Sequence, residues 1–135
     1  MECEGTPHAP CNAVKHFKWE PRGKRRIHKK PRMSEAQACK PWLVLEIGLL
    51  KPAAIVCLGT TAARSVFGRS IKIGEVRGKP LESTLAPLVM VTTHPSSILR
   101  APDSEARRQA RAELAADLRT LGELIRKRAA RRGSK

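Results

Sequence analysis

The sequence contains no apolar run that approaches the about 20 residues needed to cross a membrane. Its first ten residues have neither the apolar core of a signal peptide nor the amphipathic pattern of a transit peptide. Internal repeats are also absent, so a repeat architecture is not expected. These absences predict a soluble, intracellular protein, with the cytoplasm as its expected location.

The sequence also lacks a Cys-x-x-Cys pair. Its four cysteines are widely spaced (Cys3, Cys11, Cys39 and Cys57), and in a reducing compartment they are expected to remain free thiols. Spacing alone therefore predicts no metal site. Cys57 lies within an apolar run and is expected in the core, because a free cysteine packs as a small hydrophobic residue.

Acidic residues are few, since 12 Asp and Glu stand against 27 Lys and Arg, and the net charge is +15. Such a charge attracts polyanions, because each cation brought to a phosphate releases counterions. Nucleic acid is therefore the predicted partner, and a solvated or solubilising basic surface is the alternative. Two segments carry much of the excess, 15–32 and 126–135. Trp19, Gly23 and Ile27 interrupt the first, which suits a structured loop, whereas the second is expected to be a frayed basic tail.

At 135 residues the chain forms one domain at most. Continuous apolar runs at 53–58 and 88–93 are typical of parallel strands buried on both faces. A further strand is expected to end at 12–14, and 69–80 is expected to form short strands or a hairpin. Helical segments alternate with these runs, which predicts an α/β fold with a parallel sheet.

Three helices are expected between and after the strands. The first begins at a capping box formed by Ser34 and Gln37, and Lys51-Pro52 ends it. A short helix covers 62–67, and a long helix begins at Asp103 or Ser104. Apolar residues at helical spacing predict the buried faces of the first and last helices: Ala38, Trp42, Leu45 and Leu49 in one, and Ala106, Ala110, Leu114, Leu118, Leu121 and Ile125 in the other.

Polar residues follow two of the predicted strands, at the carboxyl ends where ligands bind in open α/β sheets. Asn12 lies at the end of the first predicted strand, and His94-Pro95-Ser96-Ser97 comes after the run at 88–93. A carboxamide, an imidazole and hydroxyls that converge there would hold a base and its phosphates. The alternative is that His94 caps a turn and the two serines cap the next segment.

A second histidine, His28, lies among Lys24, Arg25, Arg26 and Lys29. The surrounding cations oppose protonation, so its imidazole is expected to be neutral, which favours a nucleophile over an acid. The alternative is a solvated histidine in a basic loop.

Five motifs occur in order: Asn-Ala-Val-Lys-His-Phe-Lys at 12–18, Gly-Lys-Arg-Arg-Ile-His-Lys at 23–29, Ala-Cys-Lys-Pro-Trp-Leu at 38–43, Leu-Gly-Thr-Thr-Ala-Ala at 58–63 and His-Pro-Ser-Ser-Ile-Leu-Arg at 94–100. Together they resemble the iron–sulfur, family 4-like uracil-DNA glycosylases, and specifically the UdgX branch, which crosslinks to uracil-containing DNA. The resemblance covers about residues 12–125. It implies a three-layer αβα domain there, after an irregular N-terminus at 1–11 and before a basic tail at 126–135.

The resemblance also implies roles for the matching residues. Asn12 would hydrogen-bond the uracil edge, and His94 would stabilise negative charge on uracil O2. His28 would attack C1′ of the sugar and remain attached. Side chains implied to contact the DNA, with Ser96 and Ser97 on the phosphate of a flipped nucleotide, are Lys24, Arg25, Arg26, Ser96, Ser97 and Arg100. The expected partner is uracil-containing DNA, with single strands preferred, and the chain is expected to be a monomer.

The same resemblance implies a 4Fe–4S cluster, with His16 and Cys39 at two of its ligand positions. In relatives the other two ligands come from an upstream Cys-x-x-Cys, and a Gly-Glu-x-Pro-Gly loop lines the uracil pocket. Neither motif occurs in residues 1–11, so the likeness is to a C-terminal portion, N-terminally truncated, with an unpaired strand edge expected at 53–58. Two functions follow: excision of uracil with capture by His28, or a catalytically inactive DNA-binding remnant.

Overall fold

The computed structural model describes residues 12–13, 19–30 and 32–134. The elements in chain order are β1 (Trp19–Arg22), β2 (Arg25–His28), α1 (Met33–Leu50), β3 (Ile55–Leu58), α2 (Thr60–Phe67), α3 (Ile73–Val76), β4 (Pro80–Leu81), β5 (Val89–Thr92), α4 (Pro95–Leu99) and α5 (Ser104–Gly133).

The predicted α/β fold is confirmed, although the sheet is mixed rather than wholly parallel. Its strand order is β3-β5-β4. Strands β3 and β5 pair in parallel, with Ile55 opposite Val89 and Leu58 opposite Thr92. The two residues of β4 pair antiparallel with β5. In the described part of the chain β3 has a neighbour on one side only, as expected for the run at 53–58.

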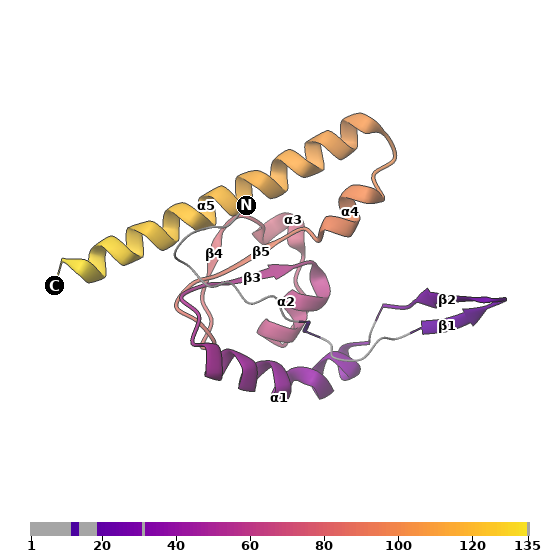
Figure 1. The fold of residues 1–135 in the computed structure, drawn as a ribbon, viewed down its shortest axis with the longest axis horizontal. Coiled ribbons are helices and arrows are strands. Elements are labelled where there is room, and N and C mark those ends of the chain that lie inside the picture. The colour runs from indigo at the N-terminus through magenta and orange to yellow at the C-terminus, as the bar shows by residue number, and fades with distance from the viewer. Residues whose placement is uncertain (1–11, 14–18, 31, 135) are drawn as a thin grey trace.

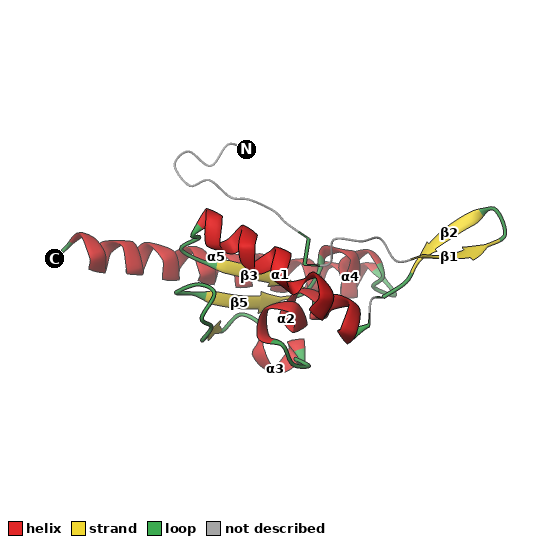
Figure 2. Ribbon diagram, turned by 90° about the horizontal axis from the view of Figure 1, so that it is seen from below, coloured by secondary structure: helices red, strands yellow, loops and turns green. Residues whose placement is uncertain are grey.

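Helices cover both faces of the sheet, which confirms three αβα layers. Helices α1 and α2 lie on one side and α5 crosses the other (Figures 1 and 2). Alternate side chains of β5 point to opposite faces of the sheet. Val89 and Val91 pack in the cluster with Leu43 of α1, whereas Met90 packs with Leu121 of α5. Burial of each such side chain contributes about 1.5–3 kcal/mol, so β5 is the centre of the core.

Helix α1 begins two residues earlier than predicted and buries a different face. Arg32 is its N-cap, and the Arg32 N–H donates to Glu35 Oε2 at 2.6 Å, so the capping box predicted at Ser34 is wrong. The side chains that are buried are Ala36, Cys39, Leu43 and Ile47. The predicted face is exposed instead, with Trp42 at 62% and Leu49 at 76%. Because both faces are apolar, spacing alone did not determine which one meets the sheet.

Helix α5 begins where the sequence predicts, since Asp103 Oδ1 accepts the Ala106 N–H at 2.7 Å. Its buried face differs at one position: Leu118 is 44% exposed, and the buried side chain beside it is Asp117. The helix continues to Gly133, so the basic segment expected to fray is helical. In the part of the chain described, no helix is both long and apolar enough to span a membrane.

Three local predictions differ from the structure. Asn12 and Ala13 are not in a strand, and Val14 lies outside the described residues. Residues 69–80 contain the one-turn helix α3 and the start of β4 instead of a hairpin. Residues 19–28, expected as a loop, form the antiparallel hairpin β1–β2 around Gly23, whose φ of 62° suits glycine at a tight turn.

Burial raises the pKa of the Cys57 thiol from 9.0 to about 12. We therefore expect Cys57 in the folded chain to resist alkylation at pH 9.0, where half of the thiol in an unfolded chain is ionised. The same shift makes stability fall as the pH rises from about 9 toward 12, because the unfolded state loses this proton first. Mass-spectrometric mapping after iodoacetamide treatment, with and without denaturant, checks this; equal labelling in both would contradict it.

Candidate functional site

Two loops follow the parallel strands and meet at the carboxyl edge of the sheet. Gly59 follows β3, and its N–H donates to the carbonyl of Thr92, the last residue of β5, at 2.9 Å. A Cβ at Gly59 would lie 3.1 Å from His94 Cβ, and the φ of Gly59 is 91°. The positive φ favours glycine there, and the close contact leaves little room for a side chain. From the sequence, Gly59 was included only in the motif at 58–63, and its place directly after the apolar run was the available signal for this close approach.

His94 is the N-cap of the one-turn helix α4. Its Nδ1 accepts the backbone N–H of Ser96 at 3.0 Å and lies 2.8 Å from Ser96 Oγ. The capping role considered as an alternative for His94 is therefore present. It does not exclude a chemical role, because the cap uses only one ring nitrogen.

The cap favours one of the two neutral forms of His94. A ring nitrogen that accepts a backbone N–H offers its lone pair, so this bond favours the neutral imidazole with its proton on Nε2. His94 is exposed, so the Nε2–H group is available to an oxygen of a ligand. The arrangement is a hydrogen-bond donor held at the carboxyl edge of a sheet.

The hydroxyl groups of the two serines in the loop have different hydrogen-bond partners. Ser97 Oγ donates to the His94 carbonyl at 2.7 Å, and the Ser97 N–H bonds the same carbonyl at 2.9 Å. Ser96 Oγ faces the His94 ring and also accepts from Arg100 Nη2 at 2.7 Å. The structure therefore brings together four predicted site residues: His94, Ser96, Ser97 and Arg100.

The basic loop predicted around His28 is the hairpin β1–β2. Lys24, Arg25 and Arg26 are exposed at its turn and on β2. His28 is the last residue of β2 and pairs with Trp19 of β1. The structure describes only the backbone of these two residues. A salt bridge of 3.0 Å joins Lys29, which directly follows β2, to Glu20 of β1.

The base of the hairpin contacts the sheet edge that carries His94. Lys30 Nζ donates to Thr60 Oγ1 at 3.4 Å, and Thr60 follows Gly59 directly. The hairpin projects from the end of the molecule where α4 lies, opposite the C-terminal end of α5 (Figures 1 and 2). The two histidine-bearing segments thus share one end of the molecule.

The remaining predicted site residues are Asn12, Cys39 and His16. Asn12 is exposed, and the adjacent Ala13 packs against the core cluster beneath α1 and α2. Cys39 is buried at 5% exposure on the inner face of α1. His16 lies outside the described residues. Within 12–13, 19–30 and 32–134, no group of three or more His, Cys, Asp or Glu side chains could hold a metal ion. Of the two predicted cluster ligands only Cys39 is described, and the described residues alone do not provide a ligand set for an iron–sulfur cluster.

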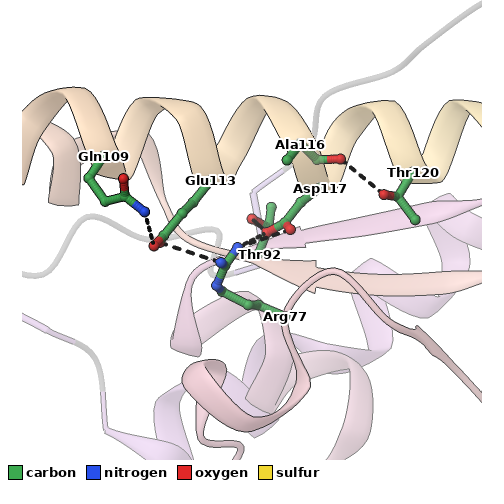
Figure 3. Close-up of polar contacts among 7 residues, drawn as sticks. All are labelled: Arg77, Thr92, Gln109, Glu113, Ala116, Asp117 and Thr120. Carbon is green, nitrogen blue, oxygen red and sulfur yellow. Dashed lines mark hydrogen bonds and ion pairs between the residues drawn. The ribbon is translucent and has the colours of Figure 1, made fainter.

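A buried carboxylate holds α5 against the end of β5 (Figure 3). Asp117, 7% exposed, accepts a hydrogen bond of 2.6 Å from Thr92 Oγ1 and bonds of 3.0 and 2.8 Å from Arg77 Nη1. Glu113 lies 3.6 Å from Arg77 Nη2. We call Asp117, Thr92 and Arg77 the α5 clamp. Because Thr92 precedes His94 by two residues, the clamp fixes the strand end from which the site starts.

Gly78 makes room for the α5 clamp. A Cβ at this position would lie 2.5 Å from Asp117 Oδ1, and the φ of Gly78 is 72°. The Gly78 N–H donates to the Val91 carbonyl at 3.1 Å, which ties this turn to β5. Sequence reasoning missed the clamp, because its members are 25 and 40 residues apart. The charged residue on the apolar side of a helix was the only local signal.

Substitution of Asp117 by alanine is expected to lower the free energy of unfolding by roughly 3 kcal/mol, since it removes the hydrogen-bonded partner of the Arg77 guanidinium, leaving Arg77 only the longer contact to Glu113, and leaves the buried Thr92 hydroxyl unpaired. Urea unfolding followed by circular dichroism measures the change. Glu123→Ala, an exposed acid on the same helix, is the matched control and should change it by less than about 0.5 kcal/mol. Equal effects of the two substitutions would contradict a clamp.

Comparison with known proteins adds to this geometry. A family model described as the uracil DNA glycosylase superfamily matches residues 10–119. Similar proteins include three named type-4 uracil-DNA glycosylase. That of Pyrobaculum aerophilum is 35% identical over 79 residues, 53% of this chain and 40% of the relative. That of Thermotoga maritima is 38% identical over 79 residues, 58% of this chain and 41% of the relative.

The third relative, from Archaeoglobus fulgidus, is 30% identical over 105 residues, 73% of this chain and 50% of the relative. The match thus spans half or less of the length of each of these three relatives. The matched region contains α1, the sheet, α4 and the first half of α5. The region that matches the family model therefore carries the His94 loop and the hairpin.

Proposed function

The chain belongs to the uracil DNA glycosylase superfamily, and from this premise we propose that it excises uracil from DNA and that His28 captures the abasic sugar covalently. Capture is the finer part of the proposal, typical of the UdgX branch. The observation that carries the excision step is the orientation of His94, whose capped Nδ1 leaves an exposed Nε2–H donor at the carboxyl edge of the sheet.

Excision requires a group that stabilises the uracil anion as it leaves. In the proposed complex the target nucleotide is flipped out of the stack, and the His94 Nε2–H donates to uracil O2. This hydrogen bond strengthens as negative charge develops on the base, so it stabilises the transition state more than the bound substrate. The Asn12 carboxamide would bond the O4 and N3–H edge of the base.

The covalent step balances without a further reactant. The bond between C1′ and N1 of uracil breaks, and its electron pair leaves with the base. The sugar becomes an oxocarbenium ion, and a lone pair on an imidazole nitrogen of His28 forms a bond to C1′. The other ring nitrogen loses its proton to solvent, and the uracil anion gains one. These steps use only the residues of this chain and the substrate.

Cations near this edge would hold the DNA. Lys24 and Arg25 are exposed on the hairpin, and each contact with a phosphate adds affinity by counterion release. Ser97, whose hydroxyl donates to the His94 carbonyl, keeps acceptor capacity but has no second hydroxyl proton. A phosphate at this loop would therefore be held chiefly by the cations.

Incubation of the purified chain with single-stranded DNA that carries one uracil tests the proposal. We expect free uracil and a band, stable to heat and SDS, that migrates above the free DNA in a denaturing gel. The same oligonucleotide with thymine in place of uracil is the control and should give neither. An abasic product without the stable band would overturn capture alone. The absence of both would overturn excision.

A second candidate is a DNA-binding protein without catalysis. The net charge of +15 and the exposed cations of the hairpin favour it. It predicts salt-sensitive binding that is equal for the uracil and thymine oligonucleotides, with no product from either. The same incubation therefore separates the two functions.

A further inference from the structure

The guanidinium of Arg100 is directed at the loop of His94. Arg100 Nη2 donates to Ser96 Oγ at 2.7 Å, and Arg100 Nε donates to the Ser96 carbonyl at 3.4 Å. The backbone N–H of Arg100 bonds the same carbonyl at 3.2 Å. Arg100 thus makes three contacts with one residue, and all of them hold Ser96 in its position under the His94 ring.

These contacts determine the direction of the Ser96 hydroxyl proton. A guanidinium only donates, so Ser96 Oγ accepts from Arg100 and must direct its own proton elsewhere. His94 Nδ1, at 2.8 Å, is the acceptor that the described residues offer. The nitrogen then receives two donors from Ser96, its O–H and its N–H. A proton on Nδ1 would oppose both, so the pair selects the tautomer that is protonated on Nε2.

We propose that Arg100 is a positioning residue that selects the Nε2–H tautomer of His94 through the Ser96 hydroxyl, instead of contacting DNA phosphate. The proposal rests on the function of His94 proposed above. It assigns Ser96 and Arg100, both expected from the sequence to bind DNA, to the control of one imidazole. The exposed cations of the hairpin remain for the phosphates.

The tautomer is measured in the free protein, so this test does not depend on catalysis. In ¹⁵N-histidine-labelled chain, under conditions where the imidazole is neutral, His94 is expected to show an unprotonated Nδ1 and a protonated Nε2. Arg100→Ala and Ser96→Ala are each expected to give a mixture of the two tautomers. A wild-type Nδ1–H form, or an unchanged His94 spectrum in both variants, would overturn the proposal even if the chain excises uracil.

Kinetics provide the second readout. Arg100→Ala is expected to lower the single-turnover rate of uracil release about tenfold, as for the loss of a hydrogen bond from a charged group, with DNA affinity within about twofold of wild type. A phosphate contact predicts the reverse: weaker binding, a salt slope smaller by about 0.7, and an unchanged rate at saturating DNA. That pattern would overturn the proposal.

A double-mutant cycle shows whether Arg100 acts through Ser96. If it does, Arg100→Ala has no further effect on the rate in a Ser96→Ala background, whereas independent roles give additive losses. Additive losses would overturn the proposal. Arg100→Lys, which keeps the charge but loses the two-nitrogen contact, separates the effect of charge from that of geometry: the proposal expects it to resemble Arg100→Ala. Unchanged thermal midpoints in all variants confirm that folding is not the cause.

Discussion

Substitution of His28 by alanine is expected to abolish the heat- and SDS-stable adduct with uracil-containing DNA. Alanine offers no lone pair to C1′, so the oxocarbenium ion is captured by water and the products are free uracil and an abasic site. Excision itself should continue, because His94 and not His28 would stabilise the leaving base. A denaturing gel, run in parallel with an assay of free uracil, measures both products.

The chain offers a matched control for this experiment. His8 is a histidine to which the proposal assigns no role, and His8→Ala should form the adduct as wild type does. A His28→Ala chain that still forms the stable band would assign the nucleophile to another residue. Loss of the band from both variants would show that the effect is not specific to His28.

Substitution of His94 by alanine is expected to slow uracil release by about 100- to 1000-fold, the usual cost of removing one donor to a developing oxyanion. The reason is the Nε2–H donor that the Ser96 cap leaves exposed. Single-turnover kinetics at saturating DNA measure the loss in the chemical step. A loss of less than about tenfold in a folded chain would contradict the assignment.

Two further measurements separate chemistry from folding in this variant. His94→Gln keeps an N–H donor on a side chain of similar length and is expected to recover part of the lost rate. The cap to Ser96 disappears in His94→Ala, which costs about 1 kcal/mol of stability. A larger fall in the free energy of unfolding would mean that the kinetic loss reports folding instead.

The sequence was informative where burial acts on every residue of a segment. The runs at 53–58 and 88–93 contain β3 and β5 because a strand with helices on both faces is apolar throughout. Asp103 marked the start of α5 because a cap needs one side chain and a backbone N–H three residues away. Such signals are local, so they can be recognised without a fold.

Predictions failed where two local patterns competed. Helix α1 has apolar residues all round, and only contact with the sheet and α2 decides that Leu43 and Ile47 face inward while Trp42 and Leu49 do not. The exposed side chains of the hairpin gave no alternation, so the pairing of β1 with β2 was not predicted. The hydrogen bonds that pair two strands join backbone groups, so they leave no mark in the side-chain pattern of the sequence.

The sequence alone determined the α/β class, the family and the two segments that carry His28 and His94. Only the tertiary structure decided the position and orientation of the His94 loop. Gly59 lies against His94, and Asp117 holds the end of β5 through Thr92. The physical reason is that a motif specifies which groups are present, whereas their direction depends on hydrogen bonds. Some of those bonds are local, such as Arg100 to Ser96. Others join residues that only packing brings together, as Asp117 and Arg77 are.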